Sequence, residues 1–316
     1  MSDILIELDK LKKERNAAIM AHYYQNSYIQ DAADFVGDSL ALAQHAKEID
    51  NDVILFCGVR FMCETAKILN PEKRVIFPDQ NAGCSLSESA PISLVEKWID
   101  NHPEFTVISY INCSAEVKAL SDIICTSSNA EKIINSLPID EKILFLPDKY
   151  LGSFLNNKTS RHMRLWNGSC QVHEIFSEEA LTELIIKYPK AKLLAHPECC
   201  ESILLYAHHI GSTASIINYT RESNNKVFII ATEPGVIHQM QKENSEKIFI
   251  PLPSNDGCAC NKCPHMRLNT LEKMVNALKN MEPEIIINEE LRIKALKPLE
   301  RMLALSLLIV NFYILI

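Results

Sequence analysis

The sequence has few glycines, and it lacks the glycine patterns that bind nucleotide phosphates. Only 8 of its 316 residues are glycine, against a usual share of about 7%. Neither a G-x-G-x-x-G nor a G-x-x-x-x-G-K-[ST] pattern occurs. The usual dinucleotide-binding and P-loop cradles are therefore excluded.

The sequence also lacks any stretch that predicts a nucleic-acid, membrane or export role. Its formal net charge is −8 and no run is rich in lysine or arginine, so we expect no nucleic-acid partner. Its first residues show neither the basic region nor the apolar core of a signal peptide, and eleven cysteines then favour a cytoplasmic location. The uncharged run 302–316 is shorter than the about 20 residues of a spanning helix. We expect no membrane association and interpret 307–316 as an atypical apolar tail.

Three cysteines lie close together near the C-terminal end, at Cys258, Cys260 and Cys263. A zinc site would normally need a second pair of Cys or His at matched spacing, and no further C-x-x-C or H-x-x-x-H occurs. A cysteine followed directly by proline, as at Cys263, is typical of iron–sulfur ligand runs. The run favours one corner of a metal cluster, and a loop of spare thiols is the alternative.

The chain repeats one pattern three times, in steps of 88 and 86 residues. In each repeat a helix leads into an apolar strand with a polar end, and these ends begin at His22, Tyr110 and His196. Hydroxyl residues follow in register at Ser39, Ser127 and Thr213. A cysteine comes after the third strand of each repeat, at Cys84, Cys170 and Cys263. Self-similarity at a fixed period predicts three related units.

Strands that alternate with helices favour small parallel sheets covered on both faces. We therefore predict an α/β fold of three pseudo-threefold-related α/β/α units around a central cavity. The predicted units are residues 1–83 with 264–306, residues 84–169, and residues 170–263. Because ligands bind beyond the carboxyl ends of parallel strands, the polar strand ends and the three cysteines should face that cavity.

Structural roles for the same residues stay open at this point. A polar residue at a strand end is often only a turn or cap group. Ser39, Ser127 and Thr213 have the residue types of helix N-caps, although a helix N-terminus is also an anion site. Cys258 and Cys260 are either spare thiols or a redox-sensitive pair. Six other cysteines lie in apolar surroundings and are expected to be buried: Cys57, Cys63, Cys113, Cys125, Cys199 and Cys200.

These residues resemble the quinolinate synthase family. The resemblance rests on segments 21–25 (AHYYQ), 37–39 (GDS), 110–112 (YIN), 125–127 (CTS), 166–173 (WNGSCQVH), 195–199 (AHPEC), 211–213 (GST) and 263–264 (CP). It implies a triangular protein with a 4Fe–4S cluster held by Cys84, Cys170 and Cys263. It further implies condensation of iminoaspartate with dihydroxyacetone phosphate to quinolinate, with release of phosphate and water. The family serves NAD biosynthesis and works with L-aspartate oxidase.

The resemblance also implies roles for single residues. The positions that match substrate-binding residues are His22, Ser39, Tyr110, Ile111, Asn112, Ser127, His196, Pro197, Glu198 and Thr213. Catalytic roles are expected for Tyr24, Tyr110, His173 and Glu198, with Tyr24 and Glu198 the leading acid–base candidates. Two features depart from the family: Tyr23 stands where many relatives have asparagine, and residues 307–316 have no counterpart.

Three thiolates on a four-iron cluster would leave one iron with an open position, where it can act as a Lewis acid. Two other classes of protein remain open on the sequence alone. An electron-transfer protein would normally bind all four irons with its own residues. A zinc-stabilised module would bind a colourless metal and show no activity on small acids.

Overall fold

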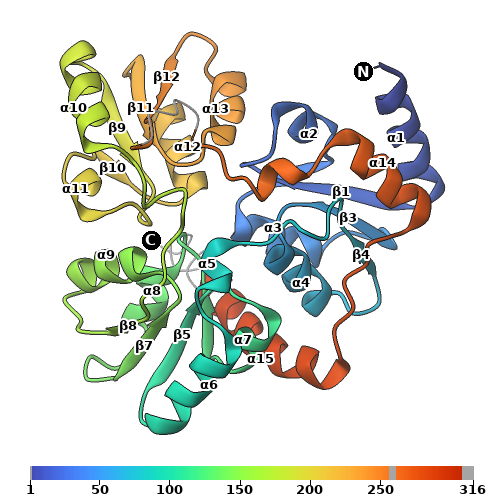
Figure 1. Cartoon of the computed structure of the whole chain (residues 1–316), viewed down its shortest axis with the longest axis horizontal. Helices are drawn as coiled ribbons and strands as arrows, with labels where there is room; N and C mark the ends of the chain where they lie inside the picture. Colours follow the sequence, from blue (N-terminus) through green and yellow to red (C-terminus); the bar gives the residue numbers. More distant parts are fainter. Residues whose placement is uncertain (1, 256–260, 308–316) are drawn as a thin grey trace.

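The computed structural model describes residues 2–255 and 261–307. In this part of the chain the strands form three four-stranded sheets, and every strand pairing within them is parallel. The first sheet has the order β2-β1-β3-β4, the second β6-β5-β7-β8 and the third β10-β9-β11-β12. The three sheets surround the centre of the molecule (Figure 1). The predicted fold class, three α/β units with small parallel sheets, is confirmed.

The sheets share one strand order along the chain. Their strands are β1 (Ala17–His22), β2 (Phe35–Gly37), β3 (Val53–Cys57), β4 (Arg74–Ile76), β5 (Thr106–Tyr110), β6 (Ile123–Cys125), β7 (Ile143–Leu146), β8 (Arg164–Leu165), β9 (Lys192–Ala195), β10 (His209–Ile210), β11 (Val227–Ala231) and β12 (Ile248–Pro251). The sequence predicted three strands in each repeat, and it missed β2, β6 and β10. These three strands have only two or three residues each, so a periodic pattern gives little signal for them.

Helices connect the strands and cover the sheets. In chain order they are α1 (Ser2–Glu14), α2 (Ser27–Ala32), α3 (Ser39–Ala46), α4 (Arg60–Leu69), α5 (Ser85–Glu88), α6 (Ile92–Asn101), α7 (Ala115–Ala119), α8 (Ala130–Asn135), α9 (Lys149–Thr159), α10 (Glu178–Lys187), α11 (Glu201–Leu204), α12 (Thr213–Glu222), η1 (Pro234–Val236), α13 (Ile237–Glu243), η2 (Met266–Leu268), α14 (Leu271–Asn280) and α15 (Glu289–Leu307). No helix in the described ranges combines the length and apolar content needed to cross a bilayer.

The last two helices return to different parts of the molecule. Helix α14 packs on α1, beside the first sheet, whereas α15 packs mainly on α7 and β6 beside the second (Figure 1). Met302 and Leu303 of α15 join a core that also contains Ile54 of the first sheet and Ile108 of the second. The predicted grouping of residues 264–306 with the first unit therefore suits α14 better than α15. The unit boundaries stay a prediction, and residues 308–316 of the tail lie outside the described residues.

Each unit has a cation that holds a loop in place just before the third strand of that unit. Lys73 Nζ donates to the carbonyls of Ile49 and Asn51, before β3. Arg161 and Lys247 do the same before β7 and β11, with bonds to the carbonyls of Leu137, Pro138, Thr220 and Ser223. Arg161 and Lys247 are each only 6% exposed. Because buried carbonyls need donors, this contact is a structural part of the repeat.

Replacing Lys247 with methionine should lower the free energy of unfolding by about 1–3 kcal/mol. Methionine keeps most of the side-chain volume but leaves two buried carbonyls without their donor. The exposed Lys226, which pairs with Glu246 at 3.4 Å, provides the control, and Lys226→Met should change stability by less than about 0.5 kcal/mol. Equal losses for the two variants in urea unfolding would contradict a structural role for Lys247.

Candidate active site

Polar residues from all three units line one cavity of about 70 Å³. The predicted residues on its wall are His22, Tyr24, Ser39, Cys84, Tyr110, Asn112, Ser127, Cys170, His173, His196, Glu198, Thr213 and Cys263. Ile111 and Pro197 do not line it. Pro197 lies on a neighbouring cavity of about 480 Å³, and Ile111 is buried with its N–H on the carbonyl of Cys125.

The parallel strands explain this convergence. Strands β1, β5 and β9 are inner strands of their sheets, and they are mostly apolar and buried, apart from Thr106 and Ser109 of β5 and Lys192 at the start of β9. Their polar carboxyl ends lie at the sheet edge that faces the centre.

The hydroxyl residues lie where helices begin, but they are not the caps. Asp38 and Ser212 are the N-caps, and they accept hydrogen bonds from the N–H groups of Ala41 and Ser215. Ser39 and Thr213 are the first residues of the two helices, so the N-cap interpretation is wrong for both. Their hydroxyls are available to the cavity.

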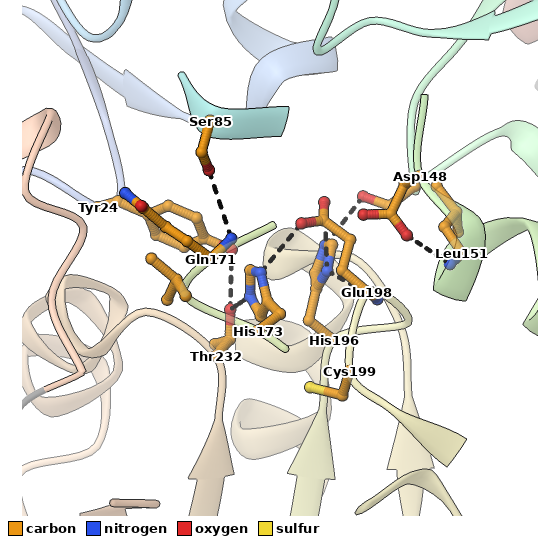
Figure 2. A network of polar contacts seen from close by, with 12 residues as sticks. Tyr24, Ser85, Asp148, Leu151, Gln171, His173, His196, Glu198, Cys199 and Thr232 are labelled. Carbon is orange, nitrogen blue, oxygen red and sulfur yellow. Dashed lines mark hydrogen bonds and ion pairs between the residues drawn. The ribbon is translucent and has the colours of Figure 1, made fainter. Parts of the chain in front are cut away.

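Glu198 is the charged centre of this wall and is 2% exposed. Its carboxylate accepts a hydrogen bond from Tyr110 Oη at 2.6 Å, and it lies 3.0 Å from His173 Nδ1 and 3.6 Å from His196 Nδ1. Figure 2 shows the carboxylate beside both imidazole rings. Burial alone would raise the pKa of Glu198, but the histidines and the bond from Tyr110 lower it overall. We infer a carboxylate that stays ionised.

A second set of contacts continues from His173 to Tyr24. His173 Nε2 lies 3.0 Å from Thr232 Oγ1, which lies 2.8 Å from Tyr24 Oη. Tyr24 Oη in turn lies 3.0 Å from Thr213 Oγ1. Burial and the charge of Glu198 hold the pKa of Tyr24 well above its usual value, so the phenol keeps its proton. Tyr110, Glu198, His173, Thr232 and Tyr24 thus form one chain along which a proton can move.

Burial also keeps two histidines of the site neutral. It lowers the pKa of His22 to about 3, and it lowers the pKa of His196 to about 3. A neutral imidazole has one donor and one acceptor nitrogen. His196 Nε2 lies 3.3 Å from Ser127 Oγ, which brings Ser127 of the second unit into the same network. Both rings can therefore orient a polar ligand without adding charge.

The three predicted thiols lie together at the same cavity, and all three are free and partly buried. Burial raises the pKa of Cys84 to about 12, and the nearby Cys263 adds to this effect. Burial, Glu198 and Cys84 likewise raise the pKa of Cys170. The ligand atoms of Cys170, His173 and Glu198 all lie within 4.8 Å of one another, so this group could hold a metal ion. A bound metal deprotonates such thiols outright.

Comparison with known proteins identifies the family. The model described as "NadA: Quinolinate synthetase A protein" matches residues 6–304. The chain belongs to the quinolinate synthase family. Among its relatives, the quinolinate synthase of Rippkaea orientalis is 54% identical over 305 residues, covering 96% of this chain and 94% of the relative. The quinolinate synthase of Chloroherpeton thalassium is 56% identical over 305 residues, covering 96% of this chain and 95% of the relative. That of Synechocystis sp. is 56% identical over 304 residues, covering 96% of each.

This member of the quinolinate synthase family has buried site residues that the sequence did not indicate. Thr232 and Glu233 follow β11, and Asp148 holds the equivalent place after β7. Glu233 accepts hydrogen bonds from Gly235 N–H, Arg267 and Cys263 N–H, and so it holds the loop of the third thiol. The repeat indicated polar ends only for β1, β5 and β9. Polar residues also follow β7 and β11 closely in the sequence, and this signal could have found Asp148, Thr232 and Glu233.

The remaining cysteines largely follow expectation. Cys57, Cys63, Cys113, Cys125 and Cys199 are buried, as predicted, whereas Cys200 is only half-buried. Cys258 and Cys260 lie outside the described residues.

Proposed function

We propose that this chain condenses iminoaspartate with dihydroxyacetone phosphate to quinolinate, with release of phosphate and water, in NAD biosynthesis. L-aspartate oxidase would be the coupled enzyme that supplies iminoaspartate. One observation carries the proposal: three thiols, one from each repeat, and a continuous acid–base chain meet at one cavity. Family membership over residues 6–304 agrees with it.

The donor set fits a 4Fe–4S cluster bound by Cys84, Cys170 and Cys263. Thiolates are the usual protein ligands of such clusters, and these three come from separate loops that end at the same cavity. The buried Oδ1 of Asn112 on the same wall has no hydrogen-bond partner in the described structure, as expected where a ligand belongs. When bound, a cluster with one open iron supplies Lewis-acid help for loss of water.

The residues of the chain supply orientation and proton transfer. The carboxylates of the substrate can be held by neutral His22 and His196 and by the hydroxyls of Ser39 and Thr213. Holding the reactants in one orientation lowers the activation barrier. Tyr24 and Glu198 lie on opposite sides of His173 in the proton chain. Tyr24 is a protonated donor, and Glu198 is an ionised acceptor. General acid–base groups of this kind typically contribute about 10² to 10⁴ in rate.

The two other classes of protein, an electron-transfer protein and a zinc-stabilised module, fit the residues that line the cavity less well. An electron-transfer protein has no use for buried tyrosine, glutamate and histidine aligned in one chain. A zinc-stabilised module would not need a ligand cavity beside its thiols. The site therefore favours an enzyme of small, anionic substrates.

The direct test is product formation by protein purified and assayed without oxygen. We expect quinolinate and phosphate when iminoaspartate and dihydroxyacetone phosphate are both present, and neither product when one substrate is omitted. Chromatography can identify quinolinate. A protein that carries an iron–sulfur cluster but forms no quinolinate from both substrates would contradict the proposal.

A further inference from the structure

In each of the first two units, one side chain donates hydrogen bonds to two carbonyls of the turn that follows the first strand. The donor is an amide in the first unit and an ammonium group in the second. Gln30 and Lys118 are 88 residues apart, in register with the repeat. Gln30 Nε2 donates to the carbonyls of Tyr23 and Gln25, both at 2.9 Å. Lys118 Nζ donates to the carbonyls at the equivalent positions, Ile111 at 3.0 Å and Cys113. The third unit has Leu204 at this place, which has no donor.

The charge of Lys118 is therefore not required to hold the turn, because a neutral amide does so in the first unit. Lys118 is fully buried, with an exposed fraction of 0%, and burying a charge without a partner is costly. No carboxylate of the described residues lies within ion-pair distance of it. Glu64, which borders the same region, is occupied by Arg60 at 3.0 Å and the N–H of Ala115 at 3.0 Å. The ammonium group lies 5.5 Å from the centroid of the Phe61 ring, and Phe61 also lines the cavity. A cation–π contact of this kind offsets only part of the cost of a buried charge.

Asn112 lies between the two carbonyls that Lys118 holds, and its backbone differs from the equivalent positions. Tyr24 N–H and Glu198 N–H bond to the preceding histidines, at 3.2 Å and 3.4 Å. Tyr110 replaces that histidine in the second unit, and Asn112 N–H has no partner within residues 2–255 and 261–307. In a trans peptide the carbonyl and the N–H point in opposite directions. Binding the carbonyl of Ile111 to Lys118 thus directs the free N–H away from the ammonium group.

The cavity beyond Asn112 needs positive charge that its own wall lacks. Neither lysine nor arginine lines it, whereas Asp38, Glu198 and Glu233 do. Arg267 lies behind the wall, but its guanidinium is paired with Glu233. If the proposed function holds, both substrates and the product carry two negative charges or nearly so. The Lys118 ammonium behind Asn112, which has no carboxylate within ion-pair distance, would then offset the wall carboxylates.

We propose that Lys118 is a specificity-determining residue, whose buried charge, acting through the turn at Asn112, selects ligands with two carboxylates over ligands with one. This inference rests on the proposed function for the identity of the ligand. Lys118 touches no substrate itself and is a positioning residue.

The test compares quinolinate with nicotinate, which lacks the 2-carboxylate, as ligands of the full chain in titration calorimetry without oxygen. Lys118→Gln copies the neutral contact made by Gln30, so the melting temperature should stay close to that of the unchanged chain. Quinolinate binding should weaken about tenfold, whereas nicotinate binding should weaken about threefold or less, because the Coulomb term scales with ligand charge. In turnover, KM should rise more than kcat falls.

A second variant keeps the inference testable if Lys118→Gln does not fold. Glu64→Gln keeps the side-chain shape and one acceptor oxygen but removes a negative charge near Lys118, so it should strengthen quinolinate binding a few-fold relative to nicotinate. Equal losses for the two ligands in Lys118→Gln, or unchanged quinolinate binding in both variants, would overturn the role of the charge. If the unchanged chain bound no quinolinate and formed none, the proposed function itself would fail, and this inference with it.

Discussion

Replacing Cys84, Cys170 or Cys263 with serine should abolish both cluster binding and quinolinate formation. One thiol follows the last strand of each repeat, and all three line the cavity, so each change removes one corner of the proposed cluster. Serine does not replace a thiolate ligand, because its hydroxyl stays protonated at neutral pH. We expect iron content close to zero and turnover at background in all three variants. Iron analysis and the quinolinate assay on protein purified without oxygen measure both effects.

The matched controls are Cys113→Ser and Cys200→Ser, which should keep iron and activity. Neither residue lines the cavity, and Cys113 is buried elsewhere. A Cys263→Ser protein that retained its cluster would move the third ligand to Cys258 or Cys260. The assignment of one cysteine to each repeat would then be wrong.

Glu198→Gln and Tyr24→Phe should each reduce kcat by about 10² to 10⁴ while the iron content stays unchanged. Glutamine has almost the shape of glutamate but lacks the charge that accepts the bond from Tyr110 Oη and lies 3.0 Å from His173 Nδ1. Phenylalanine removes the hydroxyl that joins Thr213 and Thr232. Because both changes act on proton transfer, kcat should fall more than KM rises.

The controls for this pair are Glu243→Gln and Tyr28→Phe. Glu243 pairs with Arg221 away from the cavity, and Tyr28 is 36% exposed. Both variants should turn over at nearly the unchanged rate. Near-normal turnover in both Glu198→Gln and Tyr24→Phe would remove these residues from the catalytic assignment.

The repeat made the fold and much of the site predictable. Steps of 88 and 86 residues place His22, Tyr110 and His196 at equivalent strand ends, and parallel strands then bring them to one side of each sheet. Short strands such as β10 stayed hidden because two residues carry little pattern, although the equally short β8 was predicted. The packing of α15 was also hidden, since an apolar helix face shows that it is buried but not against which partner.

Residues that act through burial were the hardest to predict. Thr232 and Glu233 look like ordinary polar residues after a strand, and only their contacts with His173 and Cys263 show a role. Lys118 looks in the sequence like one more exposed lysine of a short helix. Its burial, and its match with Gln30, become visible only once the turns of the first two units are compared.

The metal content of protein purified without oxygen tests the assignment of this cavity most directly. We expect brown protein that contains iron and inorganic sulfide, about four of each per chain. Colourless protein that carries zinc in place of iron would contradict a catalytic cluster at Cys84, Cys170 and Cys263.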